Sequence, residues 1–213
     1  MPFESPMPEI PSLTGNHIRL EPINLHHLDG LLAAATADPS LYQWTVVPQT
    51  RAAMQAYIET AMALRERGTG LPFATVRMED GAVIGATRFF DMERWSWPAA
   101  HARHGNPHPD VCEIGYTWLT RSAIRTAANT EAKLMMLTQA FESWNMVRVC
   151  LHTDARNERS RAAMERIGCK FEGILRSHRM SSDFIPRNSA RYSIIAAEWP
   201  AVKQRLVEMA APR

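Results

Sequence analysis

The sequence has few cysteines, almost no net charge and no long apolar run. Lys and Arg number 24 against 22 Asp and Glu, which gives a formal net charge of +2 over 213 residues. A nucleic-acid groove would need basic side chains gathered on one face among stacking aromatics, so this balance indicates no nucleic-acid partner. Because no run of about 18 apolar residues is present to cross a bilayer, we expect no membrane partner either.

Cysteine occurs at only three positions, Cys112, Cys150 and Cys169. The first two fall inside expected strands and the third follows an expected helix. An odd count in such places favours buried thiols in a reducing cytoplasm over disulfides. No C-x-x-C spacing occurs, so we expect no metal site built from cysteine. The sequence thus predicts a cytoplasmic protein without a cysteine metal centre.

The first residues do not resemble a targeting signal. Met1–Pro11 contains Glu4, Glu9 and several prolines in place of the basic and then apolar run of a signal peptide. We expect residues 1–12 to be a flexible leader and residues 13–213 to form a single domain. The chain is 46% hydrophobic and 22% charged, and it is long enough to bury a full core.

Apolar residues recur with the two-residue period of strands in some segments and with the 3.6-residue period of helices in others. The sequence predicts the order β-α-α-β-β-β-α-β-α-β-β-α, a mixed α/β domain around one sheet. We expect strands at 17–23, 73–78, 83–89, 111–119, 146–153, 171–178 and 191–196, and helices at 25–37, 48–67, from 126–130 to 144, 157–167 and 198–209. Asn157 is placed as an N-cap and Gly168 just past the end of its helix.

Residues 91–110 belong to neither pattern. They contain three prolines, two tryptophans and three histidines. A loop of this length either folds over a ligand as a lid, with its tryptophans lining an acceptor site, or is a decorated connection. His101, His104 and His108 lie on no regular element that would hold them in ligand geometry, so we expect no metal site there.

The stretch Val111–Trp144 predicts a strand, a short turn and a helix. In the expected strand one apolar face carries Cys112, Ile114, Tyr116 and Trp118, and the other carries Glu113, Gly115, Thr117 and Leu119. The carboxylate of Glu113 therefore has small neighbours, which leave room for a ligand on its own face.

The helix of this stretch begins among small side chains, within Thr126–Thr130. Unpaired backbone N–H groups and the positive end of the helix dipole lie together at a helix N-terminus. Small side chains let an anion approach these groups. The segment therefore predicts a phosphate or pyrophosphate site.

Four segments carry a resemblance to a known family: EIGYTWL at 113–119, TAANTEAK at 126–133, NERSRAAMERIGCKFEG at 157–173 and YSIIAAEWP at 192–200. Because they occur in matching order, the chain resembles the GNAT acetyltransferases from about His17 to Leu206. The branch that looks most similar is that of the ribosomal-protein N-terminal acetyltransferases. The resemblance implies a single GNAT-like α/β domain with a mostly antiparallel sheet, splayed fourth and fifth strands and flanking helices.

The resemblance also implies acetyl-CoA as the cosubstrate. The turn after the fourth strand would hold the pyrophosphate, the pantetheine would lie beside Trp118 and Leu119, and Asn157 would reach the pantetheine arm. The implied cofactor-binding residues of the turn are Arg125, Thr126, Ala127, Ala128, Asn129 and Thr130.

Two parts of the chain depart from the family pattern. In the family this turn follows the pattern (Q/R)-x-x-G-x-(G/A). Here residues 124–129 read IRTAAN. Ala127 restricts the backbone and brings a methyl group toward the phosphates, whereas Arg125 either adds a cation there or is simply an exposed turn residue. Met164 occupies the place of a tyrosine acid found in many members, which excludes tyrosine catalysis there. The similar branch implies Ser160 as the acid, and the alternative is a bond from its hydroxyl to its own backbone.

Glu113 is the expected general base for the acceptor amine. The alternative is that this carboxylate only pairs with a cation such as Arg148 on the adjoining strand. His152 and His178 are further candidate bases from neighbouring strands. We place them behind Glu113, since single histidines in strands are more often core or surface residues.

The sequence therefore predicts an N-acetyltransferase that moves acetyl from acetyl-CoA directly to a primary amine, with Glu113 and Ser160 as catalytic residues. Cys112 lies on the opposite face from Glu113, which argues against an acetyl-cysteine intermediate. The acceptor is a protein N-terminus or a small amine. The alternative is a non-catalytic acyl-CoA-binding module, and a homodimer is left open.

Overall fold

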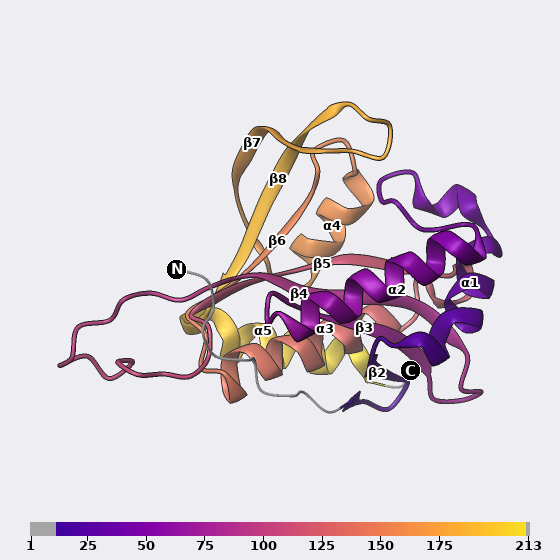
Figure 1. Ribbon diagram of the computed structural model, residues 1–213. Coiled ribbons are helices and arrows are strands. Elements are labelled where there is room, and N and C mark those ends of the chain that lie inside the picture. The colour runs from indigo at the N-terminus through magenta and orange to yellow at the C-terminus, as the bar shows by residue number, and fades with distance from the viewer. Residues whose placement is uncertain (1–11, 212–213) are drawn as a thin grey trace.

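The computed structural model describes residues 12–211, which form one eight-stranded sheet with helices on both faces (Figure 1). The strand order is β1-β2-β3-β4-β5-β6-β8-β7, and every neighbouring pair is antiparallel except β5 and β6. This confirms the mixed α/β fold with a mostly antiparallel sheet. The expected leader falls almost entirely outside the described residues.

The strands are β1 Leu13–Thr14, β2 Ile18–Pro22, β3 Gly70–Arg77, β4 Val83–Glu93, β5 Val111–Leu119, β6 Arg148–Asp154, β7 Lys170–Met180 and β8 Pro186–Ile195. The helices are α1 Leu28–Thr36, α2 Arg51–Glu66, α3 Ala128–Thr138, α4 Glu158–Arg166 and α5 Trp199–Ala210, and a π-helix, Gln139–Ser143, extends α3. Short 3-10 turns occupy 25–27, 39–42, 121–123 and 196–198. All expected strands and helices are present. The short β1 was not expected, and the β7–β8 hairpin is longer than predicted.

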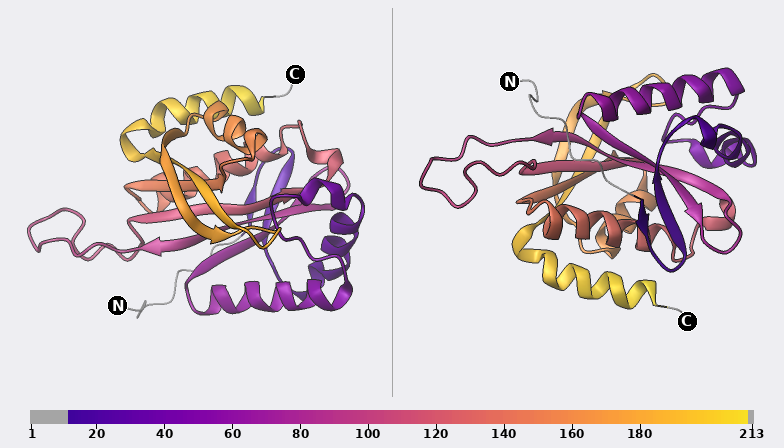
Figure 2. Two further views of the ribbon diagram at one scale, coloured as in Figure 1. Left: turned by 90° about the horizontal axis from the view of Figure 1, so that it is seen from above. Right: turned by 60° about the horizontal axis from the view of Figure 1, so that its bottom comes forward.

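The sheet separates two hydrophobic cores. On one face, α3 and α5 cover buried residues such as Phe89, Ile114 and Trp144. On the other face, α1 and α2 cover a smaller core that includes Met54 and Trp118. Figure 2 shows the sheet between these two layers of helices. None of the helices in residues 12–211 is long and apolar enough to span a membrane.

A bulge in β5 makes the predicted alternation of this strand wrong beyond Gly115. The register with β4 passes from Arg88 opposite Gly115 to Ala86 opposite Trp118, so β5 carries one extra residue. Tyr116 has a φ of 51° and is 46% exposed. The extra residue turns Trp118 to the face of α1 and α2, whereas Ile114 stays with α3.

The loop between β4 and β5 is an arm that extends beyond the sheet (Figures 1 and 2). At its base, the indole N–H of Trp97 donates to Asp110 Oδ1 at 2.8 Å and the backbone N–H of Trp95 donates to Asp110 Oδ2 at 2.8 Å. Arg103 in the arm donates to the carbonyl of Asn145. The arm extends beyond the sheet, as a decorated connection would, while a lid over a ligand and an acceptor site lined by its tryptophans stay predictions.

Candidate active site

The strands β5 and β6 run parallel but separate along their length. Their pairing is confined to Val111–Glu113 with Arg148–Cys150. Beyond it, β5 continues beside β4 to Leu119, and β6 continues beside β8 to Asp154. These are the fourth and fifth strands predicted to splay, because the unexpected β1 shifts the numbering by one. The separation leaves an opening between the carboxyl ends of two parallel strands.

A cavity of about 320 Å³ lies at these carboxyl ends. Its walls come from the segment between α1 and α2, the turn after β5 and the first turn of α4. The lining residues are Ser40, Leu41, Gln43, Trp44, Arg121, Asn157, Glu158 and Arg159. This volume falls in the usual range for small-molecule sites.

Glu113 lies at the point where β5 and β6 begin to separate. Its side chain is buried, with Oε2 at 2.7 Å from His152 Nδ1 and 3.3 Å from Arg179 Nη2. Arg179 also pairs with Asp91 at 2.6 Å. The cation predicted as the alternative partner, Arg148, instead pairs with Glu172. The carboxylate therefore faces groups of β6 and β7.

Gly115 lets the ring of Phe90 pack close to β5 beside this carboxylate. A Cβ at Gly115 would lie 2.9 Å from the ring of Phe90, tighter than real Cβ contacts, and 3.6 Å from Glu113 Oε1. A larger residue would therefore press on Phe90 and occupy the volume next to the carboxylate. The ring of Phe90 thus fills the place that a side chain at Gly115 would take, and room for a ligand on the face of Glu113 stays a prediction.

The two other candidate bases are brought to the same place by β6 and β7. The rings of His152 and His178 lie 5.2 Å apart. Although His152 Nδ1 is at ion-pair distance from Glu113, neither of its ring nitrogens makes an aligned hydrogen bond within the described residues. His178 Nδ1 lies 3.1 Å from Ser189 Oγ, and burial together with the Arg179 charge lowers the pKa of His178. The carboxylate of Glu113 and two imidazoles thus lie together where β5 and β6 separate.

The predicted pyrophosphate turn adopts the expected helix start. Helix α3 begins at Ala128 with Ala127 as its N-cap, and Thr126 Oγ1 accepts a hydrogen bond from the Ala128 N–H at 3.2 Å. Arg125 is exposed, has a φ of 64° and makes no hydrogen bond or ion pair with the described residues. Its guanidinium is thus available to an anion beside the helix N-terminus.

The other predicted cofactor residues divide by burial. The side chains of Trp118, Ala128 and Thr130 are at most 4% exposed. Leu119 packs against the larger core, and Asn129 is partly buried. These residues offer a ligand mainly their backbone groups, because their side chains belong largely to the protein interior.

Asn157 and Ser160 lie in the first turn of α4. Asn157 caps the helix as predicted, since its Oδ1 accepts a hydrogen bond from the Ser160 N–H at 3.1 Å, and it lines the cavity. The Ser160 hydroxyl makes no hydrogen bond in the part of the chain that the structure describes, so the alternative of a bond to its own backbone is not seen. No hydrogen bond or ion pair joins Ser160 to Glu113. Met164 is buried in the core.

Two arginines of this region were missed by the sequence analysis. Arg179 pairs with Glu113, and Arg88 lies over the ring of Tyr116 with its guanidinium carbon 3.8 Å from the ring centroid. Neither has a motif or a spacing that marks it, because each reaches the site only through strand pairing. Cys112 lies on the α3 face as predicted, and burial raises the pKa of its thiol, which disfavours a thiolate nucleophile.

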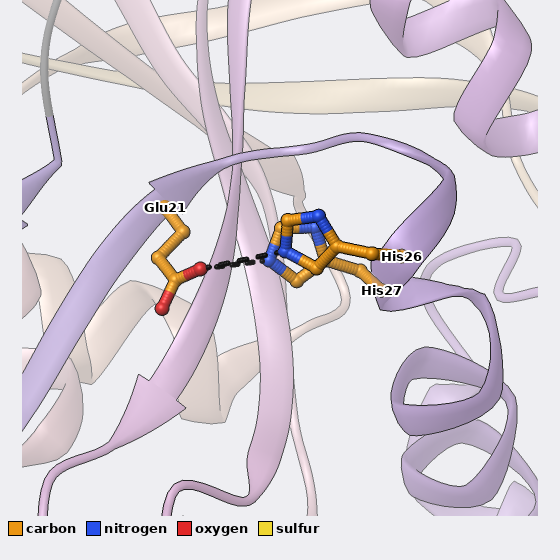
Figure 3. A group of neighbouring side chains, drawn as sticks. All are labelled: Glu21, His26 and His27. Carbon is orange, nitrogen blue, oxygen red and sulfur yellow. Dashed lines mark hydrogen bonds and ion pairs between the residues drawn. The ribbon is translucent and has the colours of Figure 1, made fainter.

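One group of three potential metal ligands occurs among the described residues, at the end of β2. Figure 3 shows His26 and His27 directed toward Glu21, whose Oε2 is 3.1 Å from His27 Nε2 and 3.7 Å from His26 Nε2. His27 Nδ1 accepts the backbone N–H of Asn24 at 3.2 Å, which places the ring proton on Nε2, and Arg19 pairs with Glu21 as well. A metal would have to displace that proton and compete with Arg19, so the group fits a structural network better than a metal site.

Burial alone would raise the pKa of Glu21, but the hydrogen bonds from Arg19 and His27 outweigh it and lower that pKa. Burial, with the nearby His26, lowers the pKa of His27. The Glu21 carboxylate and the neutral His27 imidazole therefore form a pair that connects the end of β2 to the segment that leads into α1.

Comparison with known proteins gives one family. A model of the acetyltransferase (GNAT) domain matches residues 17–170. A GCN5-related N-acetyltransferase from Brucella melitensis superimposes with a TM-score of 0.82 and 28% identity, over 96% of this chain and 87% of that one. A proposed acetyltransferase from T. thermophilus superimposes with a TM-score of 0.77 and 31% identity, over 96% of this chain and 100% of that one.

Mycobacterium smegmatis RimJ, solved in complex with CoA-disulfide, has the same fold, with a TM-score of 0.74 and 21% identity over 90% of this chain and 88% of that one. No curated protein matches the sequence. The domain match covers most of the chain, and it includes the separating strands and both helix starts of the site. This protein therefore belongs to the GNAT acetyltransferase family.

Proposed function

We propose that this protein transfers acetyl from acetyl-CoA directly to a primary amine. The observation that carries the proposal is the buried Glu113 carboxylate at the point where β5 and β6 separate. From this point β5 and β6 run on separately toward the cavity that lies between the turn after β5 and the start of α4. A thioester entering from the cavity and an amine approaching Glu113 would meet between the two strands.

The cofactor is proposed from the same arrangement. The start of α3 offers backbone N–H groups and the exposed Arg125 to a pyrophosphate. Asn157 lines the cavity and is proposed to reach the pantetheine arm, with the backbone of Trp118 and Leu119 at the end of β5 beside that arm. RimJ, which has this fold, is solved with a CoA derivative, and this supports acetyl-CoA as the cosubstrate.

The proposed reaction is a direct transfer. Glu113 takes one proton from the ammonium group of the acceptor, directly or through a water, and the resulting neutral amine attacks the thioester carbonyl. The C–N bond forms and the C–S bond breaks. The Ser160 hydroxyl donates a proton to the departing thiolate and is reprotonated by the second proton that the nitrogen loses. Arg179 and His152 hold the Glu113 carboxylate in place.

The test begins with the cofactor. A mass spectrum of the purified protein under native conditions should show bound CoA, and calorimetry should show acetyl-CoA binding. CoA release is then measured with a panel of primary amines and peptides. Binding without release across the panel would favour the rival hypothesis, a non-catalytic acyl-CoA-binding module.

Glu113→Gln tests the base. At pH 7 an aliphatic amine is mostly protonated, so loss of the base should lower kcat about 10²-fold and partly recover as rising pH supplies free amine. Glu93→Gln, at an exposed position of β4, is the matched control and should leave kcat unchanged. If Glu113→Gln keeps the kcat of the parent protein at pH 7, the base lies elsewhere, and His152 and His178 are the next to be replaced.

A further inference from the structure

Arg88 is a buried cation without an anion. It lies on β4, and the residue as a whole is only 9% exposed. No carboxylate pairs with it among residues 12–211, and its Nε is buried without a hydrogen-bond partner. Burying an uncompensated charge is costly, so a site that keeps one is suited to a ligand that supplies the opposite charge.

Aromatic rings hold the Arg88 side chain in its position. Its guanidinium carbon lies 3.8 Å from the ring centroid of Tyr116 and 5.7 Å from that of Tyr57 on α2. Tyr116 in turn meets the ring of Phe90 at 5.0 Å. These contacts use the faces of the guanidinium and none of its five N–H donors, which remain for an acceptor in the plane of the group.

Arg88 is a near neighbour of the proposed base. It lies opposite Gly115, and Phe90, two residues along β4, lies opposite Glu113. Residues two apart on a strand share a face and are roughly 7 Å apart. A small molecule with its amine beside Glu113 could therefore reach Arg88 with a group only a few bonds from that amine.

The remaining charges around Tyr116 favour an anion as well. Two carboxylates of this region, Glu113 and Asp91, are already paired with Arg179, and Asp154, whose charge acts on Arg187, is paired with Arg156. Arg187 adds a second cation near Tyr116, and burial together with the Arg179 charge lowers its pKa. Arg88 therefore stays without a carboxylate partner among residues 12–211, which favours an acceptor that itself brings an anion.

From these observations we infer that the acceptor carries a carboxylate a few bonds from its primary amine, and that Arg88 binds this carboxylate and so determines acceptor specificity. The inference rests on the proposed acetyl transfer to an amine. The carboxylate belongs to a free amino acid or to an acidic residue at the start of a peptide, and the same chemistry at Arg88 recognises both.

The experiment compares acceptors that differ only in this charge. One pair is alanine with a free or an amidated carboxylate, and the other is a tetrapeptide with Asp or Asn as its second residue. CoA release is measured at saturating acetyl-CoA. We expect the acidic member of at least one pair to have a kcat/KM roughly 10- to 100-fold higher, the range typical of a charge-assisted pair. The pair that shows the preference identifies the source of the carboxylate.

Arg88→Met tests the residue, because it keeps much of the length of the side chain and removes the charge. It should remove most of the preference by raising KM for the acidic acceptor, while the neutral acceptor and kcat change little. Arg88→Lys should restore part of the preference, which a purely structural role would not explain. Arg77→Met on the neighbouring β3, where Arg77 contacts Ser122 and Asp80, is the control and should keep the preference.

A binding measurement makes the result independent of turnover. Calorimetric titration of the preferred acidic amine into protein saturated with CoA should show binding that Arg88→Met weakens by the same factor. Equal kcat/KM for acidic and neutral members, or equal losses for both in Arg88→Met, would overturn the role of Arg88 and leave the proposed function intact. Acetyl-CoA binding without CoA release from any amine would count against the proposed function itself.

Discussion

Lys133 on α3 provides a sharp test of the energetics of this fold. Its ammonium group is buried beneath the sheet, where Nζ donates to Thr117 Oγ1 at 2.9 Å and lies 3.5 Å from Thr87 Oγ1. No carboxylate pairs with it among the described residues. Burial lowers its pKa to about 8. The nearby Cys169 gives no counter-charge at neutral pH, because burial raises the pKa of its thiol to about 12.

The expected effect of Lys133→Met follows from this pKa. A fall from 10.5 to about 8 is about 2.5 units, and at about 1.36 kcal/mol per unit the buried charge costs about 3 kcal/mol. Methionine removes the charge, fills a similar volume and gives up one charged hydrogen bond, worth about 1.5 kcal/mol. The hydroxyls of Thr87 and Thr117 still bond to each other at 2.8 Å. The net result at pH 7 should be a gain of about 2 kcal/mol in the free energy of unfolding.

The pH dependence of the free energy of unfolding provides the measurement that could refute this prediction for Lys133→Met. Between pH 8 and 10.5 the unfolded chain keeps the Lys133 proton and the folded protein loses it, so the stability of the parent protein rises with pH. Lys133→Met lacks this rise, and its advantage should shrink above pH 8 and vanish near pH 10. Urea denaturation at pH 7 and pH 10 measures both, with the exposed Lys170→Met as control. A destabilised variant at pH 7, or an advantage that does not change with pH, would show that the buried ammonium is compensated.

Three further predictions concern the site and the β2 network. Ser160→Ala should lower kcat about tenfold, and raising the pH should not restore it, because alkali supplies no proton to the leaving thiolate. The test is steady-state CoA release between pH 7 and 9. A recovery of kcat at high pH would show that Ser160 is not the acid. Arg125→Ala should weaken acetyl-CoA binding about fivefold at low salt and less at high salt, because salt screens this exposed cation. Calorimetry measures the affinity, and an unchanged affinity at low salt would place Arg125 outside the site. Because the pKa of His27 is lowered in the folded protein, the unfolded chain takes up a proton first as pH falls below about 6.5. The parent protein should therefore lose stability toward pH 5 faster than His27→Gln does. The measurement is the urea midpoint as a function of pH, and equal slopes for the two proteins would contradict this.

The sequence alone determined the elements and their order. The alternation of apolar residues, the N-cap at Asn157 and the glycine after the α4 helix are local signals, and each is reproduced by the structure apart from the second half of β5. The start of α3 was predicted within two residues because small residues and the loss of strand periodicity mark it. The family resemblance rests on the same local segments, which is why it could be recognised without coordinates.

The tertiary structure decided how these elements bring side chains together. The bulge at Tyr116 reverses the faces of β5. The residues that precede Tyr116 follow the ordinary alternation of a strand, so their pattern does not predict a non-glycine residue at positive φ. Glu113, His152 and Arg179 come from three strands, and they meet only because β6, β8 and β7 pair in that order. The isolation of Arg88 from every carboxylate in residues 12–211 depends in the same way on strand register and on the rings packed around it. Local patterns predict which residues face a sheet, but the distances between charges on different strands are set by the register of the folded sheet.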